Sequence, residues 1–261
     1  MNRRRLSLSI LAAAALALAA QAAEARKLRV AVEGAYPPFS EVAPDGSIKG
    51  FDIDIAKALC AQIKAECTLV KLDFDGMIPA LQSRKVDAIV ASMAITEERK
   101  KQVAFTDKYY NTPARFVVRA GSPITISPEG LKGKRIGVQR STTHDRFLSA
   151  TFKQSEVVRY TKQDEVFLDL ASGRIDATLQ DSVAADFGFL KTPQGKGFAF
   201  AGPSYNDAAI FGEGSGIAIR KADTALQAEL NAAIKAIRAD GRYKAIEAKY
   251  FAFDVYGDAS K

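Results

Sequence analysis

Apolar runs that fit β-strands alternate along this chain with amphipathic segments that fit α-helices. A strand, an amphipathic helix and a second strand are typical of a parallel sheet, because the helix carries the chain back to the starting edge. The alternation therefore predicts the α/β fold class. In the first half the expected strands are 27–32, 67–71 and 86–91, and the expected helices are 51–65, 75–84 and 96–103.

The pattern starts again after residue 130, which indicates a second α/β unit. A polar loop at 140–143 separates the first strand of this unit from a helix through Phe147. Because 261 residues exceed the usual size of one domain, we expect two lobes, each with its own sheet. The remaining expected strands are 135–139, 157–160, 177–180 and 216–220, and the remaining helices are 163–172 and 224–250.

The N-terminal segment fits a secretory signal peptide. Three arginines at 3–5 precede the uncharged, Ala- and Leu-rich run 6–19, and small residues follow at the cleavage positions. Cleavage is expected after Ala22, with Ala25 as the alternative, so that residues 1–22 are removed and the protein is exported to the periplasm. Loss of the three arginines and of no acidic residue takes the formal net charge from +7 to +4.

Composition excludes several classes of function. A hydrophobic content of 48% with 26% charged residues is typical of a folded globular protein. The basic clusters at 99–101 and 132–135 are not interleaved with aromatic residues, so no nucleic-acid partner is expected. Because His144 is the only histidine and Cys60 and Cys67 are the only cysteines, we expect neither a metal site nor a catalytic triad, unless His144 serves one. In an exported chain the two cysteines are expected to form a disulfide.

Several sequence blocks are similar to the extracellular solute-binding proteins that supply polar amino acids to ABC importers. The block at 50–63 (GFDIDIAKALCAQI) resembles the signature of that family. The other similar blocks follow in register at 35–40 (AYPPFS), 72–81 (LDFDGMIPAL), 87–99 (DAIVASMAITEER), 105–110 (FTDKYY), 131–138 (LKGKRIGV), 173–181 (GRIDATLQD) and 240–243 (DGRY). Together they cover essentially the whole mature chain.

This resemblance implies the two-lobed fold of type II periplasmic binding proteins. Each lobe is then a mostly parallel sheet flanked by helices, and two strands form the hinge. By analogy, lobe one comprises about 27–112 plus 212–261, and lobe two comprises about 113–211. The resemblance further implies a monomer without cofactor or catalysis, which binds a ligand between its lobes and delivers it to the membrane permease of an ABC importer.

Within the family, the chain most resembles the branch that binds lysine, arginine, ornithine or histidine. Cys60 and Cys67 match a disulfide of that branch, and the stretches 198–203 and 251–258 are similar to it as well. The expected ligand is therefore a cationic amino acid.

The resemblance assigns residues to the α-groups of such a ligand, whose charges are costly to bury without partners. Arg99, near the start of a helix, can hold the α-carboxylate with its planar fork. Asp181 lies at the end of an expected strand, where α/β sheets bind ligands, and is assigned to the α-ammonium. Thr143 adds to the carboxylate clamp, or Thr142 does if the register differs by one residue.

The side-chain pocket is assigned to lobe one. Glu33 follows the first strand and is expected to pair with the distal cation, while Tyr36 and Phe74 form aromatic walls around the aliphatic stem. Glu33, Asp181 and Arg99 sum to a charge of −1, which suits a ligand of charge +1. The expected ligand-binding set is completed by Ala91, Ser92 and Ala94; at the two alanines relatives often carry hydroxyls, so only backbone groups remain.

Two alternative functions stay open at this stage. Ser141 and His144 depart from the residues frequent in relatives, which leaves room for a larger ligand such as an opine-type arginine conjugate. Exported dehydratases share the fold by resemblance, and Glu33 or Asp181 could serve as their general acid. The substrate of such a dehydratase would be a dicarboxylate, and a site with two acidic residues suits a cation better.

Overall fold

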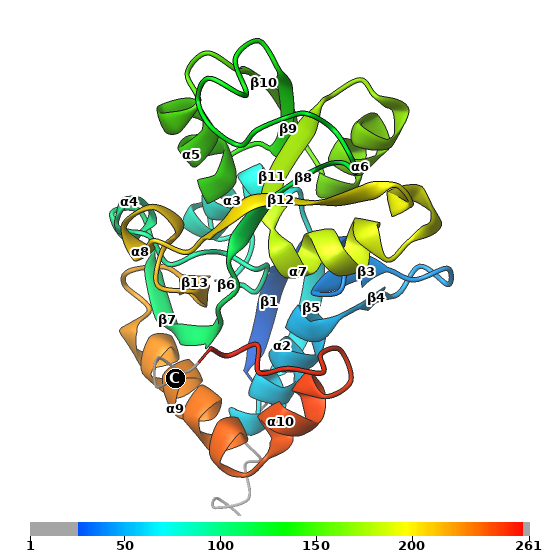
Figure 1. Cartoon of the computed structure of the whole chain (residues 1–261). Helices are drawn as coiled ribbons and strands as arrows, with labels where there is room; N and C mark the ends of the chain where they lie inside the picture. Colours follow the sequence, from blue (N-terminus) through cyan, green and yellow to red (C-terminus); the bar gives the residue numbers. More distant parts are fainter. Residues whose placement is uncertain (1–25, 258–261) are drawn as a thin grey trace, which may run out of the picture.

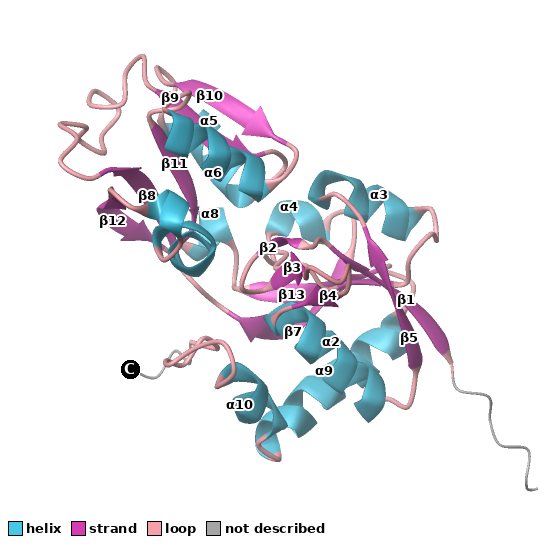
Figure 2. Cartoon of the chain, turned by 90° about the vertical axis from the view of Figure 1, so that its right-hand side faces the viewer, coloured by secondary structure: helices cyan, strands magenta, loops and turns pink. Residues whose placement is uncertain are grey.

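The computed structural model describes residues 26–257, and the expected signal peptide lies outside this range. Two five-stranded sheets lie in separate regions of the molecule (Figures 1 and 2). The first has the order β5 (Glu66–Lys71), β1 (Lys27–Val32), β6 (Ala88–Ile89), β13 (Ser215–Ile219) and β7 (Ala104–Tyr110). The second has the order β10 (Glu156–Tyr160), β9 (Arg135–Gln139), β11 (Ala177–Asp181), β8 (Ala114–Arg119) and β12 (Phe198–Tyr205).

Each sheet is parallel except for one reversed strand. In the first sheet β13 runs against β6 and β7, and in the second sheet β8 runs against β11 and β12. The reversed strand is in each case the first one formed after the chain crosses from the other sheet. The two-lobed α/β class with mostly parallel sheets, expected from the sequence, is therefore confirmed.

The chain crosses between the sheets twice. Residues 111–113 join β7 to β8 directly, and residues 206–214 lead from β12 through the short helix α8 (Ala208–Phe211) to β13. The second connection is thus partly helical, although two strands were expected. A small antiparallel sheet of β2 (Ala35–Tyr36), β3 (Ser40–Val42) and β4 (Ile48–Lys49) was not anticipated.

Helices cover both sheets on both faces. In β1, Val30 and Val32 pack toward α2 (Phe51–Gln62) and α9 (Thr224–Ala239), whereas Ala31 packs on the opposite face with α3 (Met77–Gln82). This alternation follows from the two-residue repeat of a strand. On the second sheet, separate cores form under α5 (Thr143–Thr151) and under α6 (Gln163–Ser172).

Several short elements complete the fold. They are the 3₁₀ turns Phe74–Gly76 and Pro193–Gly195, the helices α4 (Glu97–Lys100), α7 (Ser182–Ala185) and α10 (Arg242–Glu247), and the π-helical segment Asp186–Leu190. Val183 and Ala184 of α7 belong to the core of the first sheet, so α7 connects the two halves of the molecule. Within residues 26–257, none of the helices combines the length and apolar character needed to span a bilayer.

Four helix lengths differ from those expected. The helix expected over 75–84 is divided into the turn Phe74–Gly76 and α3, which ends at Gln82. The helix expected over 224–250 is divided into α9 and α10, because Gly241 has a φ of 85°, which interrupts the helical backbone. The helix expected over 51–65 ends at Gln62, just before Lys64 adopts a φ of 54°. The helix expected over 96–103 is only Glu97–Lys100, since the chain soon enters β7.

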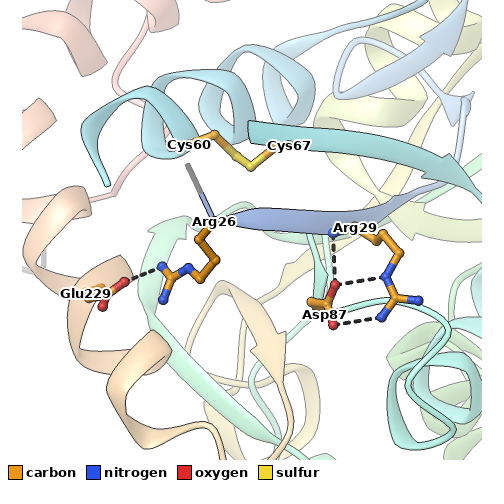
Figure 3. Close-up of a disulfide and its surroundings, with 6 residues drawn as sticks. All are labelled: Arg26, Arg29, Cys60, Cys67, Asp87 and Glu229. Atoms are coloured by element: carbon orange, nitrogen blue, oxygen red, sulfur yellow. Dashed lines mark hydrogen bonds and ion pairs between the residues drawn. A yellow bond between two sulfur atoms is a disulfide. The ribbon is translucent and has the colours of Figure 1, made fainter. Parts of the chain in front are cut away.

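The expected disulfide between Cys60 and Cys67 is present and joins the end of α2 to the start of β5, with a Cα–Cα distance of 6.1 Å (Figure 3). Beside it, Arg29 of β1 donates to both carboxylate oxygens of Asp87, at 3.0 Å each. Arg26 forms an ion pair with Glu229 of α9. These contacts hold the N-terminal strand to its neighbours.

Candidate functional site

Two adjoining hollows lie where the two sheets face each other. Both are lined by Tyr36, Ser92, Ala94, Thr143 and His144, so they form one continuous site. Carboxyl ends of parallel strands meet here, where α/β sheets bind ligands. The first hollow is lined by Glu33, Tyr36, Phe74, Ala91, Ser92, Ala94, Arg99 and Thr143, and the second also by Asp181. All the ligand-binding residues expected from the sequence are thus brought together.

Arg99 lies in α4, whose start Thr96 caps by accepting a hydrogen bond from the Arg99 N–H at 3.3 Å. Its Nη1 donates to the Ala94 carbonyl and its Nη2 to the Ser141 carbonyl, both at 3.0 Å. Each of these nitrogens carries a second hydrogen, which can serve a ligand carboxylate. Burial lowers the pKa of Arg99 to about 10, and the positive charge of Arg146 adds to this effect. The guanidinium remains charged at neutral pH.

Glu33 follows β1 directly and is only 6% exposed. Its carboxylate accepts a hydrogen bond from Nε2 of Gln139, the last residue of β9, so the contact bridges the two sheets. Burial raises the pKa of Glu33 to about 7, and the negative charges of Asp164, Asp52 and Asp73 add to the rise. A positive group in the hollow would therefore be attracted to this carboxylate.

Asp181 is the last residue of β11 and caps α7. One carboxylate oxygen accepts hydrogen bonds from the backbone N–H groups of Val183 and Ala184, at 2.8 and 2.9 Å. The other accepts from the hydroxyl of Thr112, which lies on the first crossing between the sheets. Burial raises the pKa of Asp181 to about 6, despite these hydrogen bonds. Asp181 thus caps α7, accepts a hydrogen bond from the first crossing segment and lines the second hollow.

Thr142 and Thr143 differ in the hydrogen bonds that their hydroxyls make at the start of α5. The Thr142 hydroxyl donates to the Gln139 carbonyl at 2.7 Å and accepts from the Asp145 N–H at 3.2 Å, so it is used as the helix cap. The hydroxyl of Thr143, which is buried beside the hollow, is engaged in neither contact. Both threonines line the first hollow, and of the two only the Thr142 hydroxyl is used in the helix cap.

Tyr36 and Phe74 provide the aromatic surfaces of the hollow, and both rings are buried. Tyr36 lies in β2 and packs on Phe39, with ring centroids 5.9 Å apart. Phe74 begins the turn Phe74–Gly76, and the Arg99 guanidinium carbon lies 5.3 Å from its ring centre. Phe74 therefore contacts the cation that is expected to hold a carboxylate.

Ser92 is hydrogen-bonded to a buried carboxylate, that of Asp52, which the sequence did not predict as part of the site. Its hydroxyl donates to Asp52 at 3.0 Å, its N–H donates to the Tyr109 hydroxyl at 3.1 Å, and that hydroxyl donates to Asp52 at 2.9 Å. Ser92 has a φ of 53°, which few non-glycine residues adopt. Burial raises the pKa of Asp52 to about 7. The network fixes the backbone of the segment that includes Ala91 and Ala94.

Three further residues that line the first hollow were not among the expected ligand contacts: Gln139, Gln163 and His144, of which His144 had been placed beside the ligand only as a departure from relatives. Gln139 ends β9 and Gln163 follows β10 at the start of α6. Their position after strands that face the site is the sequence signal that could have identified them. His144 is half-buried, and both burial and the charge of Arg99 lower its pKa to about 3, so it is neutral.

Two ion pairs connect the halves of the molecule at the rim. Arg140, after β9, contacts Asp75 of the turn Phe74–Gly76 at 2.7 Å, and Arg146 of α5 pairs with Glu98 of α4. These charges lie outside the buried hollow. They contribute to contact between the halves rather than to the interior of the site.

Comparison with known proteins identifies similar chains. The family model of bacterial extracellular solute-binding proteins, family 3, matches residues 28–253. The L-arginine-binding protein of Pseudomonas aeruginosa is 54% identical over 234 residues, which cover 89% of this chain and 90% of that protein. The histidine-binding periplasmic protein of Escherichia coli K12 is 46% identical over 259 residues, which cover 98% and 100%.

A solved structure is similar as well. An ancestral arginine-binding protein bound to arginine has a TM-score of 0.81 and 38% sequence identity, and the match covers 87% of this chain and 98% of that chain. The family match, the sequence relatives and the fold agree over nearly all of the described residues. This chain belongs to the bacterial extracellular solute-binding proteins, family 3.

Proposed function

We propose that this protein binds a cationic amino acid (lysine, arginine, ornithine or histidine) between its two lobes and delivers it to the membrane permease of an ABC importer. The observation that carries the proposal is the charge pattern of one buried site: Arg99 for the α-carboxylate, Asp181 for the α-ammonium and Glu33 for the distal cation. A zwitterion with an additional positive charge is the ligand that gives each of them a partner. The names of the relatives, which bind arginine and histidine, support this assignment.

The remaining assignments follow from the same proposal. Lobe one comprises about residues 27–112 plus 212–261 and lobe two about 113–211, which agrees with the strands that each sheet contains. The chain acts in the periplasm as a monomer without catalysis, after removal of the signal peptide at 1–22. Asp181 uses one oxygen for its helix cap, so its other oxygen, which accepts from Thr112, is the one offered to the ligand ammonium.

Titration calorimetry tests the proposal directly. The purified mature protein is titrated with lysine, arginine, ornithine and histidine, and with glutamine and glutamate as controls. We expect the cationic amino acids to bind at least tenfold more tightly than glutamine, a difference of about 1.4 kcal/mol. Binding of glutamate or glutamine as tight as that of every cation would contradict the proposal.

The variant Glu33→Gln then tests the side-chain pocket. It keeps the shape of the side chain and removes the charge, so affinity for lysine or arginine is expected to fall by about tenfold or more, with weak glutamine binding unchanged or improved. An equal loss for lysine and glutamine, or no loss for either, would show that Glu33 does not bind the distal cation.

A further inference from the structure

The hydrogen bonds of the first crossing divide it between the two halves of the molecule. The N–H of Asn111 donates to the carbonyl of Val255 at 2.9 Å, and Val255 belongs to the core of the first sheet. The carbonyl of Pro113 instead accepts from the first N–H of α7 at 2.8 Å, and the hydroxyl of Thr112 donates to Asp181. Thr112 is therefore the first residue of the crossing that is bonded to the second half.

The carboxylate of Asp181 is fixed by three hydrogen bonds but keeps a free acceptor position. Its Oδ1 accepts from two backbone N–H groups of α7, at 2.8 and 2.9 Å. Its Oδ2 accepts from the hydroxyl of Thr112. Because a carboxylate oxygen can accept about two hydrogen bonds, Oδ2 has room for one more donor. The bond from Thr112 thus determines where that remaining position points.

The hydroxyl oxygen of Thr112 is itself an acceptor. Its one proton is donated to Asp181, so that any further hydrogen bond must be one that the oxygen accepts. Among residues 26–257, none donates a hydrogen bond to this oxygen. Thr112 and Asp181 both line the second hollow. Two neighbouring acceptor oxygens, one of them charged, match a positively charged group with several N–H donors, and an ammonium has three.

The segment of the first half that lines the second hollow offers few hydroxyls of its own. Ala94 has none, and the Ser92 hydroxyl is bonded to Asp52 at 3.0 Å. Thr112 therefore supplies a side-chain hydroxyl at this end of the site, on the crossing rather than on the segment that contains Ala94.

We propose that Thr112 is a further ligand-binding and positioning residue: its hydroxyl holds the Asp181 carboxylate in place and adds a second acceptor oxygen for the α-ammonium of the ligand. This inference rests on the proposed function, because it concerns the ammonium partner of the same ligand. Since Thr112 and Asp181 are bonded to each other within the second half, both acceptors are assembled before the two lobes close on a ligand.

The test uses variants of the full-length mature protein. Thr112→Val and Thr112→Ala remove the hydroxyl, the first with the shape of the side chain retained, and Thr112→Ser keeps it. Thr192→Val is the matched control: Thr192 is also partly buried and its hydroxyl donates one hydrogen bond, to the Phe189 carbonyl at 2.7 Å, but it lines neither hollow. Calorimetry gives the dissociation constants of arginine and lysine, and thermal melting identifies the folded variants.

Thr112→Val and Thr112→Ala are expected to weaken arginine and lysine by the same factor of about ten, because both ligands have the same α-ammonium. The loss is measured in whichever of the two is folded. Thr112→Ser should bind nearly as tightly as the unaltered protein, and Thr192→Val should bind normally.

The inference is overturned if removal of the Thr112 hydroxyl leaves affinity unchanged or weakens only one of the two ligands. It is equally overturned if Thr112→Ser binds as weakly as Thr112→Val, or if Thr192→Val loses as much affinity. The proposed function fails separately, and this inference with it, if neither arginine nor lysine binds the unaltered protein.

Discussion

Arg99 combines a structural and a binding role in one buried guanidinium. Arg99→Ala is expected to weaken every α-amino acid ligand by about 2 to 5 kcal/mol, the usual loss when one partner of a buried charge pair is truncated. Calorimetry with lysine, arginine and glutamine measures this loss. Lys100→Ala, an exposed change in the same helix, serves as the control and should bind normally. Near-normal affinity in Arg99→Ala would exclude Arg99 from the carboxylate clamp.

Glu33 is expected to make ligand binding depend on pH. Its pKa of about 7 means that the carboxylate is increasingly protonated below neutrality, and a bound cation favours the ionised form. Affinity for arginine or lysine should therefore fall by about tenfold as the pH is lowered from about 8 to about 6, with proton release on binding near pH 7.

Calorimetry in two buffers of different ionisation enthalpy measures this proton release. Asp52 and Asp181 also have raised pKa values, about 7 and about 6, and contribute to the slope. Glu33→Gln removes the part of the slope that belongs to Glu33. An identical pH profile in this variant would show that another group is responsible.

At the scale of the secondary-structure elements, variants of the two threonines at the start of α5 are expected to separate an effect on stability from an effect on ligand binding. Thr142→Ala removes the helix cap and is expected to lower the free energy of unfolding by about 1 kcal/mol, with a smaller effect on affinity. Thr143→Ala leaves the cap intact and should weaken ligand binding with little change in stability. Chemical denaturation and calorimetry on both variants test this pair. The reverse outcome would assign the ligand contact to Thr142.

Some expected strands are found with the same bounds, whereas the strand expected over 86–91, although mostly buried, is only Ala88–Ile89. The strand expected over 27–32 is found as Lys27–Val32, and the one over 135–139 as Arg135–Gln139. Helix ends were harder to predict, because Gly241 and Lys64 act through backbone angles that depend on tertiary context. The paired strands β2 and β3 are too short for a hydrophobic repeat to indicate them.

The residues of the site also differ in how far the sequence could identify them. The strand end at Asp181 could be located from sequence, and resemblance supplied roles for Arg99 and Glu33. Asp52 could not be found, because its position looks like an ordinary polar residue in the first turn of a helix. Only the packing of α2 under Ser92 brings that carboxylate beneath the site.

At the scale of the whole molecule, the rim ion pairs are expected to slow ligand release. Reversing Asp75 and Glu98 to lysine places like charges opposite Arg140 and Arg146. Exposed pairs contribute about 0 to 1 kcal/mol each, so the ligand dissociation rate should rise by roughly several-fold. Adding Arg140→Glu and Arg146→Glu to the same chain should restore slow release. Stopped-flow fluorescence of ligand dissociation provides the measurement.

A matched control reverses a pair within one sheet. Lys49 and Glu41, on neighbouring strands β4 and β3, are 3.2 Å apart and do not connect the two halves. Glu41→Lys should leave ligand dissociation unchanged. If it accelerates release as much as the rim variants do, the effect belongs to net charge rather than to contact between the lobes.

The position of β13 in the first sheet determines which of the two sheets has all its strands first as the chain is made. This strand lies between β6 and β7, yet it is made about a hundred residues after them, whereas all strands of the second sheet lie between residues 114 and 205. As the chain emerges with its N-terminus first, all strands of the second sheet are therefore available before β13. The N-terminal strands, although made earliest, must wait for residues 215–219 before their sheet can close.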